Sequence, residues 1–208
     1  MKKLFLSAAV VMGSLAFAQQ FGIKAGMNVS SLSDDATLSD QSSKIGFNAG
    51  VFMNAPIAEN FSIQPEILYN NLGSKVTLTK TDVGNTTYRT EYARHLDYIT
   101  VPVMFQYNAT PAFYLEAGPE FGLMVSAKDK LKSTENGNTT GTVTSDISTD
   151  NFNTFNFGVG LGAGYYFTPN VGLTARYTAG LSDIAKDRPS GSDAVKNNVF
   201  QVGLAYKF

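Results

Sequence analysis

The feature that most constrains this chain is a strict two-residue alternation over its last eleven residues, 198–208. The alternate positions that end at Phe208 are mostly large and apolar, whereas the intervening positions are small or polar. Because successive side chains of a strand point to opposite faces, this period predicts a strand between two different environments. A strand whose apolar face runs to the final residue is expected in a transmembrane barrel, where one face meets lipid and the other meets the lumen.

Further segments alternate in the same way and give eight predicted strands in total. Each of them reaches the roughly 9–11 residues that a tilted membrane strand requires. They cover residues 21–31, 44–54, 60–72, 97–107, 112–126, 153–167, 170–181 and 198–208. Pro65, Pro102 and Pro119 lie inside these segments. Because proline cannot donate to a strand ladder, we predict bulges or kinks at these three positions.

The connections between the predicted strands alternate in length. Short turns at 55–59, 109–111 and 168–169 separate longer polar stretches at 32–43, 78–95, 127–152 and 182–196. Outer-membrane barrels have this asymmetry, with short periplasmic turns and longer outside loops. The predicted fold is therefore an all-β, eight-stranded antiparallel up-and-down transmembrane β-barrel with short periplasmic turns, long extracellular loops and both mature termini in the periplasm.

The charged residues of the predicted strands fall almost entirely on one face. On the outward faces the only charged residue is Asp97, at the outer rim. The inward faces carry three bases and three acids: Lys24, Glu66, Glu116, Glu120, Arg176 and Lys207. A lysine or arginine that faces lipid at the bilayer midplane costs about 2–4 kcal/mol, which explains the asymmetry. Because an unpaired buried charge is also expensive, we predict that the six interior charges form a paired network.

Aromatic residues gather near both ends of the predicted strands, as in the interfacial girdles of membrane barrels. The girdle near the turns contains Phe21, Phe61, Tyr107, Phe113, Phe167, Tyr206 and Phe208, and the girdle toward the loops contains Phe47, Tyr69, Tyr98, Phe155 and Tyr177. The alternative is a soluble barrel with the apolar faces inside. Its interior would have to hold nearly all of these rings, which is more than a small barrel accommodates.

The N-terminus has the anatomy of a secretory signal peptide. A short basic start is followed by an apolar run that ends at Phe17, and Ala16-Phe17-Ala18 fits a small-x-small cleavage site. The run is shorter than the roughly 20 residues of a membrane-spanning helix, although an uncleaved anchor is the alternative. We expect a signal peptide at 1–18 and a barrel domain at 19–208.

The signal peptide, the opening Gly22-x-Lys24-x-Gly26-x-Asn28, the stretch 98–102 and the chain end resemble the PorT family of outer-membrane β-barrel proteins. These proteins are similar in architecture to the small OmpA and OmpX barrels. The last residues also resemble the assembly signal of bacterial outer-membrane barrels, through Gln201, Gly203, Tyr206 and Phe208. The resemblance implies outer-membrane lipid and the barrel assembly machinery as partners. It implies no catalytic residues.

The sequence favours a structural or interaction role for a monomer, with the long loops presenting a surface to an extracellular or envelope protein. The formal net charge of −1 and the absence of a Lys/Arg cluster argue against nucleic acid, and the absence of cysteine excludes thiolate metal sites. No cofactor is expected.

Three alternatives stay open at this point. One is a narrow gated channel, because the predicted lumen is polar and glycine-lined. Another is a soluble lipocalin-like carrier, although the chain has no Trp. The last is an outer-membrane lipid hydrolase that uses His95, Asp97 and Ser126, although alternation places Ser126 on the inward face.

Overall fold

The computed structural model describes residues 19–32, 41–82, 84–186 and 194–208. The predicted signal peptide at 1–18 lies outside these residues, as do parts of three predicted loops, 32–43, 78–95 and 182–196. The strands are β1 (Gln20–Leu32), β2 (Gln41–Ala58), β3 (Phe61–Thr81), β4 (Thr87–Asn108), β5 (Phe113–Glu135), β6 (Asn138–Ile147), β7 (Phe155–Tyr166), β8 (Val171–Gly180) and β9 (Asn197–Lys207), and a short 3-10 helix, η1, spans Thr149–Asn151.

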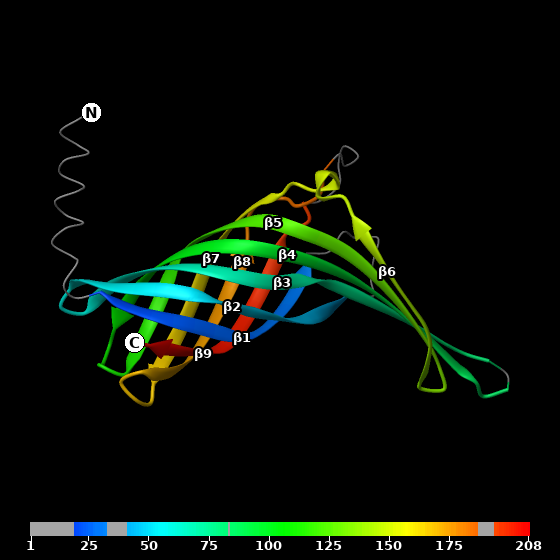
Figure 1. Cartoon of the computed structure of the whole chain (residues 1–208), viewed down its shortest axis with the longest axis horizontal. Helices are drawn as coiled ribbons and strands as arrows, with labels where there is room; N and C mark the ends of the chain where they lie inside the picture. Colours follow the sequence, from blue (N-terminus) through cyan, green and yellow to red (C-terminus); the bar gives the residue numbers. More distant parts are fainter. Residues whose placement is uncertain (1–18, 33–40, 83, 187–193) are drawn as a thin grey trace.

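Eight of the strands close into a ring. The order is β4-β3-β2-β1-β9-β8-β7-β5, with a further β4–β5 pairing that closes the circle, and every pairing is antiparallel. The remaining strand, β6, pairs with β5 alone among the described strands. The eight-stranded up-and-down barrel is therefore confirmed. Figure 1 shows the short turns and the C-terminus at one end of the barrel and long hairpins at the other.

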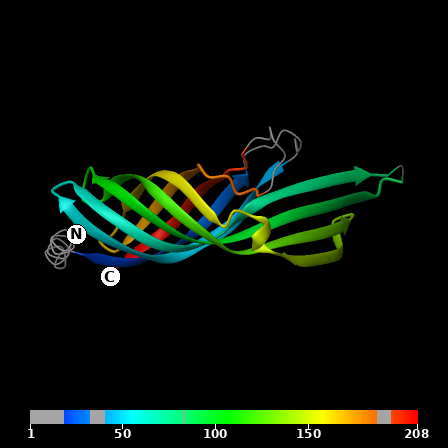
Figure 2. The same cartoon turned by 90° about the horizontal axis from the view of Figure 1, so that it is seen from above.

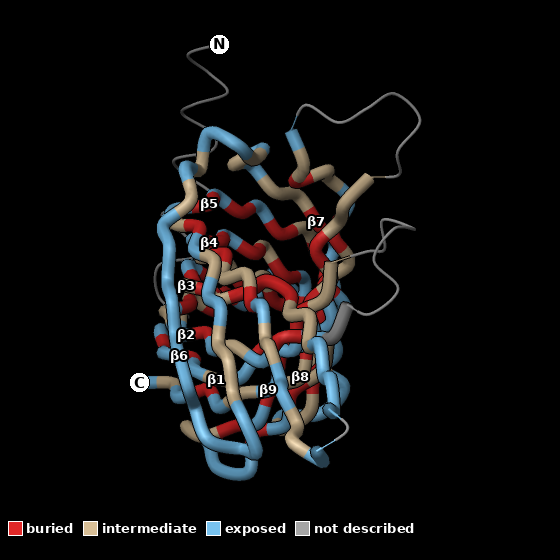
Figure 3. The backbone as a smooth tube through the Cα atoms, turned by 90° about the vertical axis from the view of Figure 1, so that its right-hand side faces the viewer, coloured by how far each residue is buried: buried red, intermediate tan, exposed pale blue. Residues whose placement is uncertain are grey.

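The side-chain facing also agrees with the prediction. On the outer surface Ile67 is 56% exposed and Leu161 is 67% exposed, whereas the inward Arg176 is 1% exposed. Figure 3 shows buried and exposed positions alternating along the barrel strands. No helix among the described residues is long and apolar enough to cross a membrane. The sheet thus has an apolar outer surface and a polar interior, the arrangement that a surrounding bilayer requires.

For two of the predicted extracellular loops, the prediction of irregular structure is wrong. Residues 78–95 and 127–152 are largely strand: β3 and β4 extend as one hairpin and β5 and β6 as another, well beyond the barrel (Figure 2). The turn of the second hairpin is Asn136-Gly137, with φ angles of 46° and 84°. Both residues therefore adopt the positive φ that tight hairpin turns require, and this turn sets the strand pairing on either side.

The predicted bulges at the three prolines are also wrong. Register is unchanged past Pro65, since Phe52 pairs with Glu66 and Ala55 with Ile63. The pairings on either side of Pro102 and Pro119 likewise run without a shift. The irregularity that matters most lies between Asp97 and Tyr98, where Tyr98 faces Met124 and Asp97 faces Ser126. Val125 is thus an additional residue on β5, and the facing of β5 reverses beyond it.

The position of Tyr98 differs from the prediction that placed it in the aromatic girdle toward the loops. Its side chain is 0% exposed and lies inside the barrel. Other girdle residues remain on the outer surface, and Phe61 and Tyr107 pack with ring centroids 5.3 Å apart. Tyr98 is separated by an even number of residues from the buried Thr100 and Met104, so its side chain points to the same, inward face of the strand.

Candidate functional site

The centre of the lumen holds a compact ionic cluster built on Arg176. Its guanidinium donates to both carboxylate oxygens of Glu66, at 2.9 and 2.6 Å, and through Nε to Oε1 of Glu116 at 2.7 Å. The Lys24 ammonium lies 3.6 Å from Glu66 Oε1. All four side chains are almost completely buried. Two positive and two negative groups therefore neutralise one another where desolvation makes an isolated charge costly.

The other two predicted members of this network lie apart from it. Glu120 makes no ion pair with a described residue and accepts a long hydrogen bond from Thr178 Oγ1 at 3.5 Å. The Lys207 ammonium lies 3.9 Å from the centroid of the Tyr166 ring, at the periplasmic end of the lumen. The structure thus brings together four of the six predicted residues. It also places a cation not singled out from the sequence, Lys44, inside the outer part of the lumen, where its ammonium donates to Leu72 O at 3.1 Å.

Neutral polar side chains surround the ionic cluster. Gln64 donates to Glu66 at 2.8 Å and Gln106 donates to Glu116 at 3.1 Å, so the carboxylates have further partners. Toward the end with the long hairpins a belt of amides lines the lumen, and Gln201 of β9 donates to Asn70 of β3 at 2.8 Å. This bond connects strands that are three places apart in the ring. The interior is therefore a cross-linked polar layer rather than an open passage.

An apolar cluster closes the lumen above this polar layer. Leu72, Leu96, Tyr98, Met124, Ala127, Ile184 and Val199 pack together there, and each is buried. Ile184 comes from the segment after β8, so the chain outside the strands contributes to this cluster. Because these apolar side chains are buried and pack together, the cluster forms an outer plug.

A second cluster closes the periplasmic end, where Phe52, Tyr114, Tyr166 and Ala205 pack together. The Tyr114 and Tyr166 rings lie 6.1 Å apart. A Cβ atom at Gly164 would lie 2.3 Å from Tyr114 Cζ, so only glycine admits the ring at this point. We call this cluster the inner plug. The two plugs leave the ionic cluster enclosed between them.

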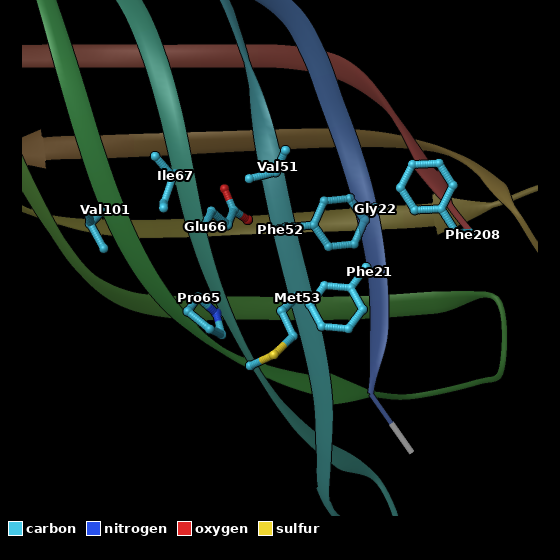
Figure 4. Close-up of a pocket in the computed structure, with 10 residues that line it drawn as sticks. All are labelled: Phe21, Gly22, Val51, Phe52, Met53, Pro65, Glu66, Ile67, Val101 and Phe208. Atoms are coloured by element: carbon cyan, nitrogen blue, oxygen red, sulfur yellow. The ribbon is translucent and has the colours of Figure 1, made fainter. Parts of the chain in front are cut away.

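The outer wall carries an apolar groove near the periplasmic end of β1–β4 (Figure 4). It encloses about 550 Å³ and is lined mainly by Phe21, Val51, Met53, Pro65, Ile67 and Val101. These side chains belong to the outward faces of their strands. In a bilayer the groove faces hydrocarbon, so its shape and chemistry suit a lipid acyl chain.

The two long hairpins join into one four-stranded sheet outside the barrel, in the order β3-β4-β5-β6. We call it the projecting sheet; it covers residues 73–81, 87–95, 128–135 and 138–146. Its inner face continues the lumen side of the barrel wall, and its outer face continues the lipid side. Val76, Tyr92, Leu131 and Val143 form one cross-strand row on the inner face. Tyr92 is 41% exposed and Val143 is 60% exposed, so this row is open to water.

An ion pair holds the base of the projecting sheet. The Arg94 guanidinium donates to both oxygens of Asp129 at 2.9 Å, and the Tyr92 hydroxyl also donates to Asp129. Burial acts to raise the pKa of Asp129, but the hydrogen bonds from Arg94 and Tyr92 outweigh it and hold that pKa below its ordinary value. The pair therefore stabilises the sheet at neutral pH, and its contribution is lost as pH falls through the lowered pKa.

The predicted hydrolase residues do not assemble into a catalytic triad. The reversed facing of β5 places Ser126 opposite Asp97, which corrects the inward position expected for Ser126. However, Asp97 accepts from Asn71 at 2.5 Å, and no hydrogen bond between described residues joins His95 to Ser126. No cluster of three or more His, Cys, Asp or Glu side chains suited to a metal occurs within the described ranges.

The residues of the predicted assembly signal lie on both faces of β9. Gln201 points inward and donates to Asn70 at 2.8 Å. Gly203 faces Gly26, and a Cβ on it would lie 2.5 Å from Ala25 O, so its small size permits the close approach of β9 and β1. Tyr206 and Phe208 point outward, with ring centroids 5.7 Å apart.

Comparison with solved structures finds several similar proteins. The chain is similar in structure to Ail of Yersinia pestis, the attachment invasion locus protein, solved with the heparin analogue sucrose octasulfate (14% identity, TM-score 0.48, 92% of this chain and 100% of that one). It is also similar to Neisserial surface protein A (17%, 0.47, 90% and 97%) and to OprG of Pseudomonas aeruginosa (14%, 0.38, 92% and 96%). No curated protein sequence matches it.

A family model gives the assignment. The model described as outer membrane protein beta-barrel domain matches residues 17–186, which is most of the chain. The match includes seven of the eight strands of the closed ring, all except β9. The chain therefore belongs to the outer membrane protein beta-barrel domain family and is a bacterial outer-membrane protein.

Proposed function

We propose that this protein is a closed, monomeric barrel that anchors the projecting sheet at the cell surface as an interaction surface for an extracellular or envelope protein. The observation that carries the proposal is the filled lumen: the outer plug, the ionic cluster and the inner plug follow one another along its length. A barrel without an open passage is better suited to display than to transport. The large structured extension on one side of the membrane then becomes its main functional element.

The same proposal includes the finer expectations from the sequence. Export through a signal peptide at 1–18 and insertion by the barrel assembly machinery fit the chain ends. The PorT resemblance adds a link to protein secretion and surface display, since a member of that family has such a role. We propose no enzymatic activity and no cofactor. The partner surface is the inner face of the projecting sheet, because the row through Tyr92, Leu131 and Val143 is apolar yet exposed. Exposed apolar patches of this kind are typical of protein interaction sites and uncommon on the rest of a protein surface.

Electrical recordings test the closed lumen. We expect the folded protein to show no steady conductance in a planar bilayer, because side chains of both plugs fill the path. A second variant replaces Tyr114 and Tyr166 by alanine; because the outer plug and the ionic cluster still fill the path, we expect it to show no steady conductance either. Both proteins must first show heat-modifiable migration, the mark of a folded barrel. A large steady conductance of the unmodified protein would contradict the proposal and favour the narrow channel instead.

Site-specific crosslinking in intact cells tests the interaction surface. A photoreactive residue at Val143 is expected to give a discrete protein adduct, because that side chain is 60% exposed on the inner face. The same residue at Leu161, which is 67% exposed on the lipid-facing wall, should crosslink only to lipid. Absence of protein adducts from Val143, Tyr92 and Leu131 alike would rule out a partner on this face.

A further inference from the structure

The outer face of the projecting sheet is basic, whereas the inner face is neutral. Alternate residues of the same four strands give the outer face five bases, Lys75, Arg89, Lys128, Lys130 and Lys132, against two acids, Glu91 and Asp146. The inner face carries Lys80 and Arg94 against Asp129 and Glu135. The strands thus separate charge by face, and the excess of positive charge lies entirely on the side that continues the lipid-facing wall.

Part of this positive charge is already neutralised. Lys128 pairs with Asp146 at 3.1 Å, and Arg89 lies 3.7 Å from Glu91. The other three lysines, Lys75, Lys130 and Lys132, make no ion pair with a described residue. Lys75 and Lys130 face the small Ala93 from either side, and Lys132 is two residues beyond Lys130. The outer face therefore holds three lysines outside any ion pair between described residues, and the nearest acid in register is Glu91, opposite Lys132.

The height of these lysines relative to the bilayer follows from the strand geometry. Val125, 49% exposed, is the last apolar residue on the lipid-facing side of β5. With a rise of about 3.3 Å per residue and a tilt of about 40°, Lys128, Lys130 and Lys132 stand roughly 8, 13 and 18 Å above it. The headgroup layer of a leaflet is about 5–8 Å thick, so Lys128 lies at its top, and Lys130 and Lys132 lie above it, where only a lipid with an extended, sugar-containing headgroup reaches them.

We propose that the outer face of the projecting sheet binds the phosphate groups of the anionic glycolipid, lipopolysaccharide, in the outer leaflet of the outer membrane. Lys75, Lys130 and Lys132 supply the charge, and the projecting sheet is thereby supported against the membrane surface. The inference rests on the proposed function in one respect, namely that the sheet stands outside the membrane. It does not depend on whether the lumen conducts or on whether the inner face has a protein partner.

Lipid-selective fluorescence quenching tests the proposal. The chain contains no tryptophan, so Val125→Trp introduces a single reporter at the upper edge of the lipid-facing apolar wall, just below the headgroups. The protein is reconstituted in phosphatidylcholine that contains either brominated bisphosphorylated lipid A or brominated phosphatidylcholine at equal mole fraction. We expect stronger quenching by the lipid A. Neutralising Lys75, Lys130 and Lys132 to glutamine should lower this preference on the order of a hundredfold, since each lysine near an anionic surface contributes about fivefold.

Three controls make the outcome decisive. The triple Lys→Arg variant should keep the preference, and Lys80→Gln on the inner face should leave it unchanged. Brominated lipid A without its phosphates should show no preference. A parent protein without preference, a preference that survives the triple glutamine change, or an equal preference for dephosphorylated lipid A would each overturn the proposal. Heat-modifiable migration of every variant shows that the barrel is folded.

Discussion

Replacing Arg176 by methionine is expected to lower the free energy of unfolding by about 3–5 kcal/mol. The change removes the group that binds both Glu66 and Glu116, and leaves two carboxylates buried without it. Lys24, at 3.6 Å from Glu66, is too distant to replace a bidentate guanidinium. The measurement is urea-induced unfolding in detergent micelles, followed by the loss of heat-modifiable migration.

A matched variant separates lost charge pairing from lost volume. The double change Arg176→Met and Glu116→Gln leaves one carboxylate, Glu66, facing the Lys24 ammonium, so the remaining charges compensate each other and we expect it to recover most of the stability. The control substitution Arg89→Met removes an arginine from the exposed surface and should change stability by less than about 0.5 kcal/mol. Equal losses in the single and double variants would show that packing, not charge compensation, gives Arg176 its importance.

The sequence predicts the barrel well because the bilayer imposes a strict rule on it. Any strand that crosses hydrocarbon must keep charges off its lipid-facing side. Charged residues such as Lys24, Glu116 and Arg176 therefore show which face of each strand points into the lumen. The closed ring confirms the eight crossings, and the burial of these side chains follows the alternation. The sequence does not predict which of the interior charges pair with one another. Whether Arg176 reaches Glu66 or Glu120 depends on the stagger between strands that are not neighbours, which alternation alone does not specify.

The projecting sheet was missed because its strands lie outside the bilayer. There threonine and lysine alternate with tyrosine and leucine. Because water surrounds both faces, a polar or charged side chain costs little free energy on either of them. The sequence of these segments therefore resembles that of polar loops. One local signal was available. Asn136-Gly137 is the dipeptide most typical of a tight hairpin, and alternating residues flank it on both sides. The reversal of facing at Val125 could not be predicted in this way, because a bulge leaves no fixed pattern in the sequence.

A charge on the lipid-facing wall gives the sharpest test of the membrane assignment itself. Leu161→Arg places a guanidinium near the middle of β7, on a side chain that is 67% exposed. If hydrocarbon surrounds this wall, the substitution should cost about 2–4 kcal/mol in vesicles. Val143→Arg is the matched control, since it makes the same change at a similarly exposed residue of the projecting sheet, 60% exposed, and should cost less than about 0.5 kcal/mol.

The two variants introduce the same side chain and differ in the medium that surrounds it. Both replace an aliphatic residue by arginine on an exposed strand position, and neither position contacts the plugs or the ionic cluster. Unfolding of both proteins from phosphatidylcholine vesicles by guanidinium chloride gives the difference directly. Equal costs would mean that the apolar wall and the projecting sheet meet the same medium. The division of this molecule into a lipid-embedded barrel and a water-exposed sheet would then be wrong.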